Sequence, residues 1–301
     1  MLHARMRFGL TTPIVTRHPA NDAPWTEDAG PAELSRIAVA ADRLGYHHLT
    51  CSEHIAIPTS VAPVRGARYY DPLATLGFLA AQTTRIKLVT HVLVLGYHHP
   101  LAIAKRYGTL DRLSGGRLVL GVGVGTLREE FDLLGADFAG RGARFEDALR
   151  ALRAAFGRRE PVYAGTHYRF ADVFVDPCGV QTDVPIWLGG RTPRSLRRAL
   201  LFGDGWDPFG LGLDTLSAML ARARTSAAWR DRSKPFDVVL SLDRQLDATD
   251  PTERAELADL VEEYGAAGAT VLNLRFRHRS LAHYLEQLEA FAADVVLRAG
   301  G

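Results

Sequence analysis

Residues able to exchange protons follow the second apolar run of the chain. Ser52 ends the run His48–Ser52, Glu53 and His54 follow it directly, and His91 interrupts the next run. A lone histidine is more often structural, but two at the ends of adjacent strands favour a site. We therefore predict that His54 is a general acid or base, with Glu53 orienting it or acting in its place.

A glycine-rich stretch, Ser114–Phe131, stands at the centre of the chain. Its apolar run is typical of a strand buried on both faces, and Gly121, Gly123 and Gly125 recur at every second position. Three side chains are therefore missing from one face, which leaves room for a flat ligand or for another backbone. The taper of a barrel rim is an equally good explanation. The third glycine of a dinucleotide fingerprint is absent.

A second pair of glycines, Gly189 and Gly190, precedes a helix that Thr192-Pro193 is expected to begin. Free backbone N–H groups and the helix dipole favour an anion there, and Arg191 could add a charge-assisted contact. This predicts a phosphate site, with an ordinary strand-to-helix turn as the alternative. The general rule for barrels places phosphate after the last two strands, so this site departs from it.

Other chemistries find little support. His47, His48, Glu53 and His54 do not form a zinc-binding H-E-x-x-H motif, and His98-His99 is expected to be an exposed loop pair. We expect no metal. A serine hydrolase is not indicated either, because the G-x-S-x-G motif is absent.

Regular alternation of strands and helices must position these residues. It predicts an α/β fold, a single (β/α)8 TIM barrel spanning 1–301 as one domain, with sites at the carboxyl ends of the strands. Insertions are expected after strands two and four, the latter hairpin-like over Pro161–Asp183. An open doubly wound sheet is the alternative, but Thr11-Thr12-Pro13 lacks the required glycine-rich turn. The predicted strands are Arg7–Thr12, His48–Ser52, Ile86–Leu95, Arg117–Val124, Pro185–Leu188, Gly205–Phe209, Phe236–Leu242 and Thr270–Phe276.

Composition limits the partners. The chain has 301 residues, 47% of them hydrophobic, and a formal net charge of +2. This balance indicates neither nucleic acid nor a membrane surface as a partner. Two cysteines, and a start at Met1–Leu10 without the apolar core of a signal peptide, predict a reducing, cytoplasmic setting.

The chain resembles the bacterial luciferase-like family of flavin-dependent enzymes, and within it the branch that uses the deazaflavin coenzyme F420. Sister branches bind FMN in the same barrel. The resemblance is carried by Cys51–His54, Tyr70–Leu73 through Thr84–Ile86, Leu110–Arg117 through Glu129–Phe131, and Pro185–Gly190 through Gly203–Trp206.

This resemblance implies a cofactor ring at the barrel mouth. Ser52, Glu53 and His54 would lie near its reactive face, and His91-Val92 would form a bulge with a non-proline cis peptide behind it. Gly123, Gly125 and Thr126 would line the ring or ribityl chain. Gly189, Gly190 and Arg191 would hold the phosphate, helped by Trp206.

The implied function is hydride transfer between reduced coenzyme F420 and a small organic substrate that the sequence does not identify. An FMN-dependent monooxygenase is the enzyme alternative, and a flavin-binding barrel without turnover is the second. We expect a homodimer.

Overall fold

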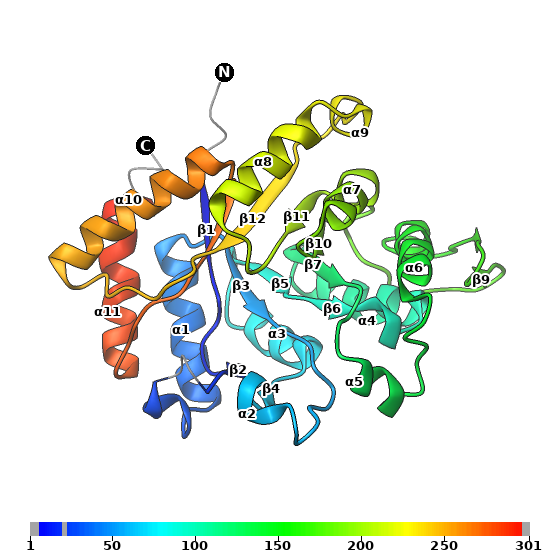
Figure 1. Ribbon diagram of the computed structural model, residues 1–301. Coiled ribbons are helices and arrows are strands. Elements are labelled where there is room, and N and C mark those ends of the chain that lie inside the picture. The colour runs from blue at the N-terminus through cyan, green and yellow to red at the C-terminus, as the bar shows by residue number, and fades with distance from the viewer. Residues whose placement is uncertain (1–5, 20–22, 297–301) are drawn as a thin grey trace.

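A closed barrel of parallel strands forms the centre of the molecule (Figure 1). The computed structural model of the protein describes residues 6–19 and 23–296. Within these residues eight parallel strands close the barrel, in the order in which they follow along the chain. They are β1 (Arg7–Leu10), β3 (His48–Cys51), β5 (Lys87–Thr90), β7 (Leu118–Gly123), β10 (Ile186–Gly189), β11 (Gly205–Asp207), β12 (Asp237–Ser241) and β13 (Val271–Leu274).

Pairing of the first strand with the last distinguishes the barrel from an open sheet. Strand β1 pairs in parallel with β3 through Leu10 and Leu49, and with β13 through Arg7 and Val271. Strand β7 pairs with β10, which completes the ring. The predicted (β/α)8 barrel is confirmed, and the doubly wound alternative is wrong.

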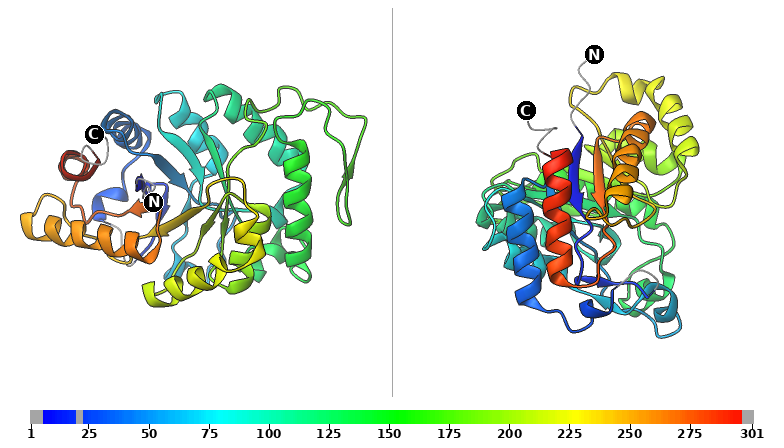
Figure 2. Two further views of the ribbon diagram at one scale, coloured as in Figure 1. Left: turned by 90° about the horizontal axis from the view of Figure 1, so that it is seen from above. Right: turned by 90° about the vertical axis from the view of Figure 1, so that its left-hand side faces the viewer.

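Helices cover the outside of the barrel, and α1 and α11 lie side by side on one flank (Figure 2). Side-chain caps that the sequence pattern predicts begin several of them. Asp71 Oδ1 accepts a hydrogen bond from Ala74 N at 2.8 Å, and Ser280 Oγ accepts one from His283 N at 3.1 Å. The helices are α1 (Pro31–Leu44), α3 (Pro72–Ala80), α4 (Pro100–Leu113), α5 (Arg128–Leu133), α6 (Arg141–Ala155), α7 (Pro193–Phe202), α8 (Leu213–Arg224), α9 (Ala227–Arg230), α10 (Pro251–Ala267), α11 (Leu281–Phe291) and the π-helical η3 (Ala292–Val296).

The two expected insertions are present. The segment after β3 carries α2 (Ala62–Arg65) and β4 (Arg68–Tyr69), which pairs with β2 (Thr16–Arg17) below the barrel mouth in Figure 1. The hairpin of β8 (Tyr163–Ala164) and β9 (Arg169–Phe170) extends away from the barrel beside α6. Short 3-10 turns η1 (Pro24–Thr26) and η2 (Leu95–Tyr97) complete the described elements.

Two predicted elements are divided. The expected strand Ile86–Leu95 ends at Thr90, and a separate β6 (Leu93–Val94) pairs further along β7, with Val122 and Gly123. The apolar pattern over Leu213–Trp229 predicts one helix, but the structure breaks it before Ser226, whose hydroxyl caps α9 through Trp229 N. Serine competes for backbone hydrogen bonds inside a helix and favours a cap, which explains this break.

The alternating glycines of β7 make room for the protein itself. A Cβ atom added at Gly121 would lie 1.9 Å from the Thr90 carbonyl oxygen, and one at Gly123 would lie 2.8 Å from Val92. At Gly125 it would meet Phe131 at 2.5 Å. Close approach of another part of the chain, one of the possibilities that the spacing left open, is therefore present at all three glycines. Contact of Gly123 and Gly125 with a cofactor stays a prediction.

The barrel interior contains an apolar cluster and, separate from it, buried polar side chains. An apolar inner cluster is made by Val89, Val119, Trp187, Val239 and Val271. Asn273 and Asp207 are buried polar residues nearer the carboxyl ends of their strands, and Asn273 hydrogen-bonds the buried His48 at the start of β3. A larger apolar cluster fills the space between strands and helices. No helix in the described part of the chain is long and apolar enough to cross a membrane.

We predict opposite effects on stability for two glycine-to-alanine variants. Gly121→Ala should lower the free energy of unfolding by at least about 1–3 kcal/mol, because backbone blocks the new methyl group. Gly77→Ala should raise it by about 0.5–1 kcal/mol, because alanine favours helix α3 and, apart from the adjacent backbone of that helix, no described atom lies within 4 Å of the added carbon. Urea unfolding measures both, and equal effects would contradict the packing of β7.

Candidate active site

His54 lies at the mouth of the barrel, just after β3, and is held by a carboxylate from α5. Its Nδ1 lies 2.7 Å from Glu130 Oε2, and 17% of the His54 side chain is exposed. Because Glu130 occupies Nδ1, the imidazole presents Nε2 as the nitrogen able to exchange a proton. The edge of Tyr69 packs on the ring, with centroids 4.5 Å apart.

Glu130 is fully buried and accepts hydrogen bonds from several segments. Its Oε1 accepts from Ile55 N at 2.6 Å and Ala56 N at 3.2 Å, and its Oε2 accepts from the Tyr97 hydroxyl at 2.9 Å. Burial alone would raise the pKa of Glu130. The hydrogen bonds from His54 and the two amides outweigh burial, so the pKa lies below its ordinary value. Glu130 is therefore an ionised anchor for His54.

Glu53 has a different role from the predicted one. Its Oε2 accepts from Val94 N at 2.7 Å, and its Oε1 lies 2.7 Å from His98 Nε2. The carboxylate that contacts His54 is Glu130, so the expectation that Glu53 orients His54 is wrong. His98 is also not the exposed loop residue that we expected, since only 18% of its side chain is exposed. Glu53 instead fastens the segment after β5.

The peptide bond between His91 and Val92 is cis, as the resemblance implied. The side chain of Val92 packs toward Gly123 and Gly189. The ring of His91 reaches the other way, to Asp207 at the end of β11, with Nε2 2.9 Å from Oδ2. Burial would lower the pKa of His91, but the Asp207 carboxylate outweighs it and raises the pKa above the ordinary value.

The predicted phosphate loop has the backbone geometry of a tight turn. Gly190 has φ 123°, a conformation that side-chain-bearing residues rarely adopt. Thr192 and Ser195 cap α7 reciprocally, with Thr192 Oγ1 accepting from Ser195 N at 3.2 Å. Trp206 is fully buried, and its Nε1 donates to Gly190 O at 2.8 Å. Trp206 was expected to contact a ligand, but its buried ring instead supports the loop through Gly190.

Charge at this loop suits an anion. The first turn of α7 has no acidic residue, and the cap is a neutral hydroxyl. Arg191 is exposed and lies over the Phe209 ring, 5.4 Å from its centroid. Arg194 is exposed on the same turn. Backbone donors, a helix dipole and cations thus coincide, which fits a phosphate.

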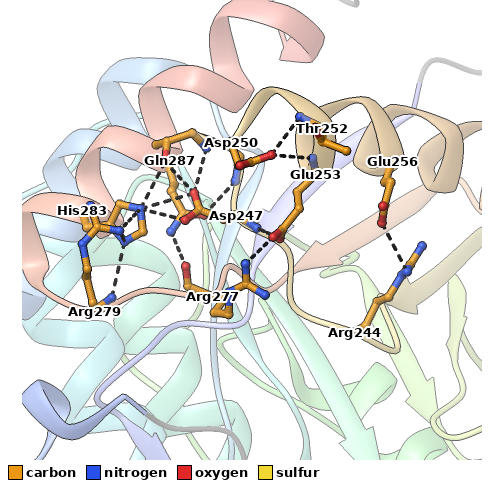
Figure 3. A network of polar contacts seen from close by, with 12 residues as sticks. Arg244, Asp247, Asp250, Thr252, Glu253, Glu256, Arg277, Arg279, His283 and Gln287 are labelled. Atoms are coloured by element: carbon orange, nitrogen blue, oxygen red, sulfur yellow. Dashed lines mark hydrogen bonds and ion pairs between the residues drawn. The ribbon is translucent and has the colours of Figure 1, made fainter.

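The loops after the last two strands suit an anion less well (Figure 3). Asp250 caps α10 by accepting from Glu253 N at 3.1 Å, and Glu253 in turn accepts from Asp247 N at 2.8 Å. Asp247 also pairs with the buried His283 at 3.1 Å. The three carboxylates all follow β12, and the arginine after β13 that lies nearest them, Arg277, is already paired with Glu253. This network therefore offers an anion less free positive charge than the start of α7.

The remaining predicted residues line the same mouth. Ser52 follows β3 and is partly buried, whereas Thr126 follows the last glycine of the β7 loop and is exposed. Among the residues described, no group of three histidine, cysteine or acidic side chains is placed to hold a metal ion.

Three important residues were missed by sequence reasoning. Glu130 occupies a position four residues before Leu134 and three after Leu127, on the apolar side of its helix. A charged residue there signals a buried partner. Asp207 stands inside the predicted strand Gly205–Phe209, and Asn273 interrupts an apolar one, which are comparable signals.

Comparison with known proteins supplies the family. A model of luciferase-like monooxygenases matches residues 6–300. An uncharacterised protein of Mycobacterium tuberculosis is 30% identical over 220 residues, which make up 69% of this chain and 76% of that protein. An F420-dependent glucose-6-phosphate dehydrogenase of Intrasporangium calvum is 28% identical over 233 residues, 72% of this chain and 68% of the relative.

Solved structures share the barrel. An F420-dependent secondary alcohol dehydrogenase, in complex with an F420–acetone adduct, superimposes with a TM-score of 0.73 at 15% identity, over 98% of this chain and 99% of that one. The oxygenating constituent of 3,6-diketocamphane monooxygenase from Pseudomonas putida, in complex with FMN, gives 0.74 at 17% identity over the same shares. At these identities the likeness concerns the fold.

We predict that Glu130 is required for the stability of the mouth. Glu130→Ala should lower the free energy of unfolding by about 3–5 kcal/mol, because it leaves buried donors without an acceptor. Glu130→Gln, which keeps one carbonyl oxygen, should cost less. The pKa of Glu130 is lowered in the folded state, so its contribution is present above the ordinary glutamate value and is lost as pH falls below about 4.3.

Urea unfolding at pH 7 and at pH 4 measures this difference. The control is Glu129→Gln, a neighbour with an exposed side chain. If the two glutamine variants have equal stability at pH 7, Glu130 does not anchor the loops.

Proposed function

Because the chain belongs to the luciferase-like monooxygenase family, we propose that it is an oxidoreductase that uses coenzyme F420 to transfer hydride between that cofactor and a small organic molecule. The observation that carries this proposal is the His54–Glu130 pair, a fixed imidazole with its second nitrogen available at the barrel mouth. Relatives named for F420-dependent dehydrogenation support the choice of cofactor.

The start of α7 offers groups that suit the phosphate of such a cofactor. Gly189, Gly190 and the start of α7 would bind the phosphate, and Arg191 would contribute positive charge. The cofactor, when bound, supplies or accepts the hydride; the protein supplies binding, orientation and protons.

The acid–base work falls to His54 in this proposal. Glu130 accepts from Nδ1 and so fixes the tautomer and the direction of the ring, which leaves Nε2 to give a proton to the substrate or take one from it. Glu53 holds the segment of Val94 and His98 in place beside it. The roles of Ser52, Thr126 and the glycine loops in contacting the cofactor, the homodimer and the cytoplasmic location remain predictions.

The cofactor is tested by titrating the purified protein with coenzyme F420 and with FMN. Both have a tricyclic ring, a ribityl chain and a phosphate, but only F420 continues into a tail with additional carboxylates. Arg191 and Arg194 can meet this tail by charge-assisted hydrogen bonds. We therefore expect F420 to bind about tenfold more tightly, equivalent to about 1.4 kcal/mol.

Matched variants test whether Arg191 and Arg194 cause the tighter binding of F420. Arg191→Gln and Arg194→Gln should reduce binding of F420 more than that of FMN, whereas Arg197→Gln, one turn further along α7, should change neither. In an anaerobic assay with reduced F420, His54→Ala should lower turnover by roughly 10²-fold. Tighter binding of FMN with oxygen-dependent product formation would favour the monooxygenase, and binding of neither cofactor would favour a barrel without turnover.

A further inference from the structure

An ion pair spans the interior of the barrel mouth, from His91 after β5 to Asp207 at the end of β11. The two side chains meet at 2.9 Å, with 20% of the His91 side chain exposed and 4% of the Asp207 side chain exposed. Strands β7 and β10 lie between β5 and β11 in the barrel, so the pair crosses the interior and does not join neighbours. One end of the pair is therefore buried, while the imidazole reaches the open mouth.

Side chains from several strands surround His91. Asn273 on β13 lies 3.5 Å from His91 Nε2, and the other end of its amide accepts from His48 Nε2 at 2.6 Å. His48 is neutral, because burial lowers its pKa well below the ordinary value. Arg275, just beyond β13, disfavours a positive His91, whereas Asp207 favours it. The charged groups that face His91 are thus one carboxylate and one guanidinium.

The imidazolium form has a donor left for a ligand. Both ring nitrogens donate when histidine is protonated, and Asp207 engages Nε2. Nδ1–H is then a second donor that the pair with Asp207 does not use. Such a charge-assisted hydrogen bond is stronger than a neutral one, and partial burial increases its strength further.

We propose that the His91–Asp207 pair makes the barrel mouth selective for the reduced form of the cofactor. This inference rests on the proposed function. A hydride carries two electrons and one proton, so the ring that receives it gains one unit of negative charge, and the substrate that gives it loses one. A fixed donor such as His91 Nδ1–H therefore stabilises the more negative, reduced ring more than it stabilises the oxidised ring.

The test is the ratio of the dissociation constants for oxidised and reduced F420, measured anaerobically by titration. We expect His91→Gln to reduce the preference for the reduced form by about tenfold or more. The matched control is His167→Gln, an exposed histidine on the β8–β9 hairpin, which should leave the ratio unchanged. An unchanged ratio in His91→Gln overturns the inference while the proposed function stands.

Two measurements require no folded His91 variant. Because the pKa of His91 is raised, the preference of the wild-type protein should be complete below the ordinary histidine value of about 6.5 and decline as pH rises through the raised pKa. Without cofactor, an NMR titration should find a lower pKa for His91 in Asp207→Asn than in the wild type. A pH-independent ratio, or an equal pKa in both proteins, overturns the inference. Failure of the wild type to bind either form contradicts the proposed function, and this inference with it.

Discussion

A single buried carboxylate, that of Glu130, holds together the segments around the candidate acid–base residue. It accepts from the His54 ring, from the backbone that follows it, and from Tyr97 beyond β6. Two parts of the chain that are distant in sequence, residues 54–56 and Tyr97, therefore converge on the two oxygen atoms of Glu130. An ionised group is costly to bury without partners, so Glu130 needs all of these donors. The segments that supply them are therefore held together as one unit at the mouth.

Strand β7 provides the second constraint on the mouth. Its glycines allow the backbone of β5 and the side chain of Val92 to approach more closely than any larger residue would permit. This brings the segment containing His91 against the strand from which α5 and Glu130 follow. The same close approach places Val92 against Gly123 and Gly189, and the ring of His91 reaches Asp207. The acid–base pair and the ion pair thus depend on one packing arrangement.

Local signals in the sequence were sufficient for the barrel and for the position of His54. Alternating apolar runs, proline-containing caps such as Asp71-Pro72, and turn glycines are short-range features, and the strands and most helices follow from them. Partners across the barrel are not short-range. Glu53 is adjacent to His54 in sequence, yet consecutive residues of an extended segment point in different directions, so its carboxylate reaches His98. Trp206 and Asp207 likewise acquire their roles from loops that fold against them.

The most direct test of this account is a crystal structure of the protein prepared anaerobically with coenzyme F420. We predict density for the phosphate at the start of α7, beside Gly190, and for the ring between His54 and the His91–Val92 segment. A phosphate bound instead at the loops after β12 and β13, among Asp247, Asp250 and Glu253, would contradict the account, as would a ring that contacts neither histidine.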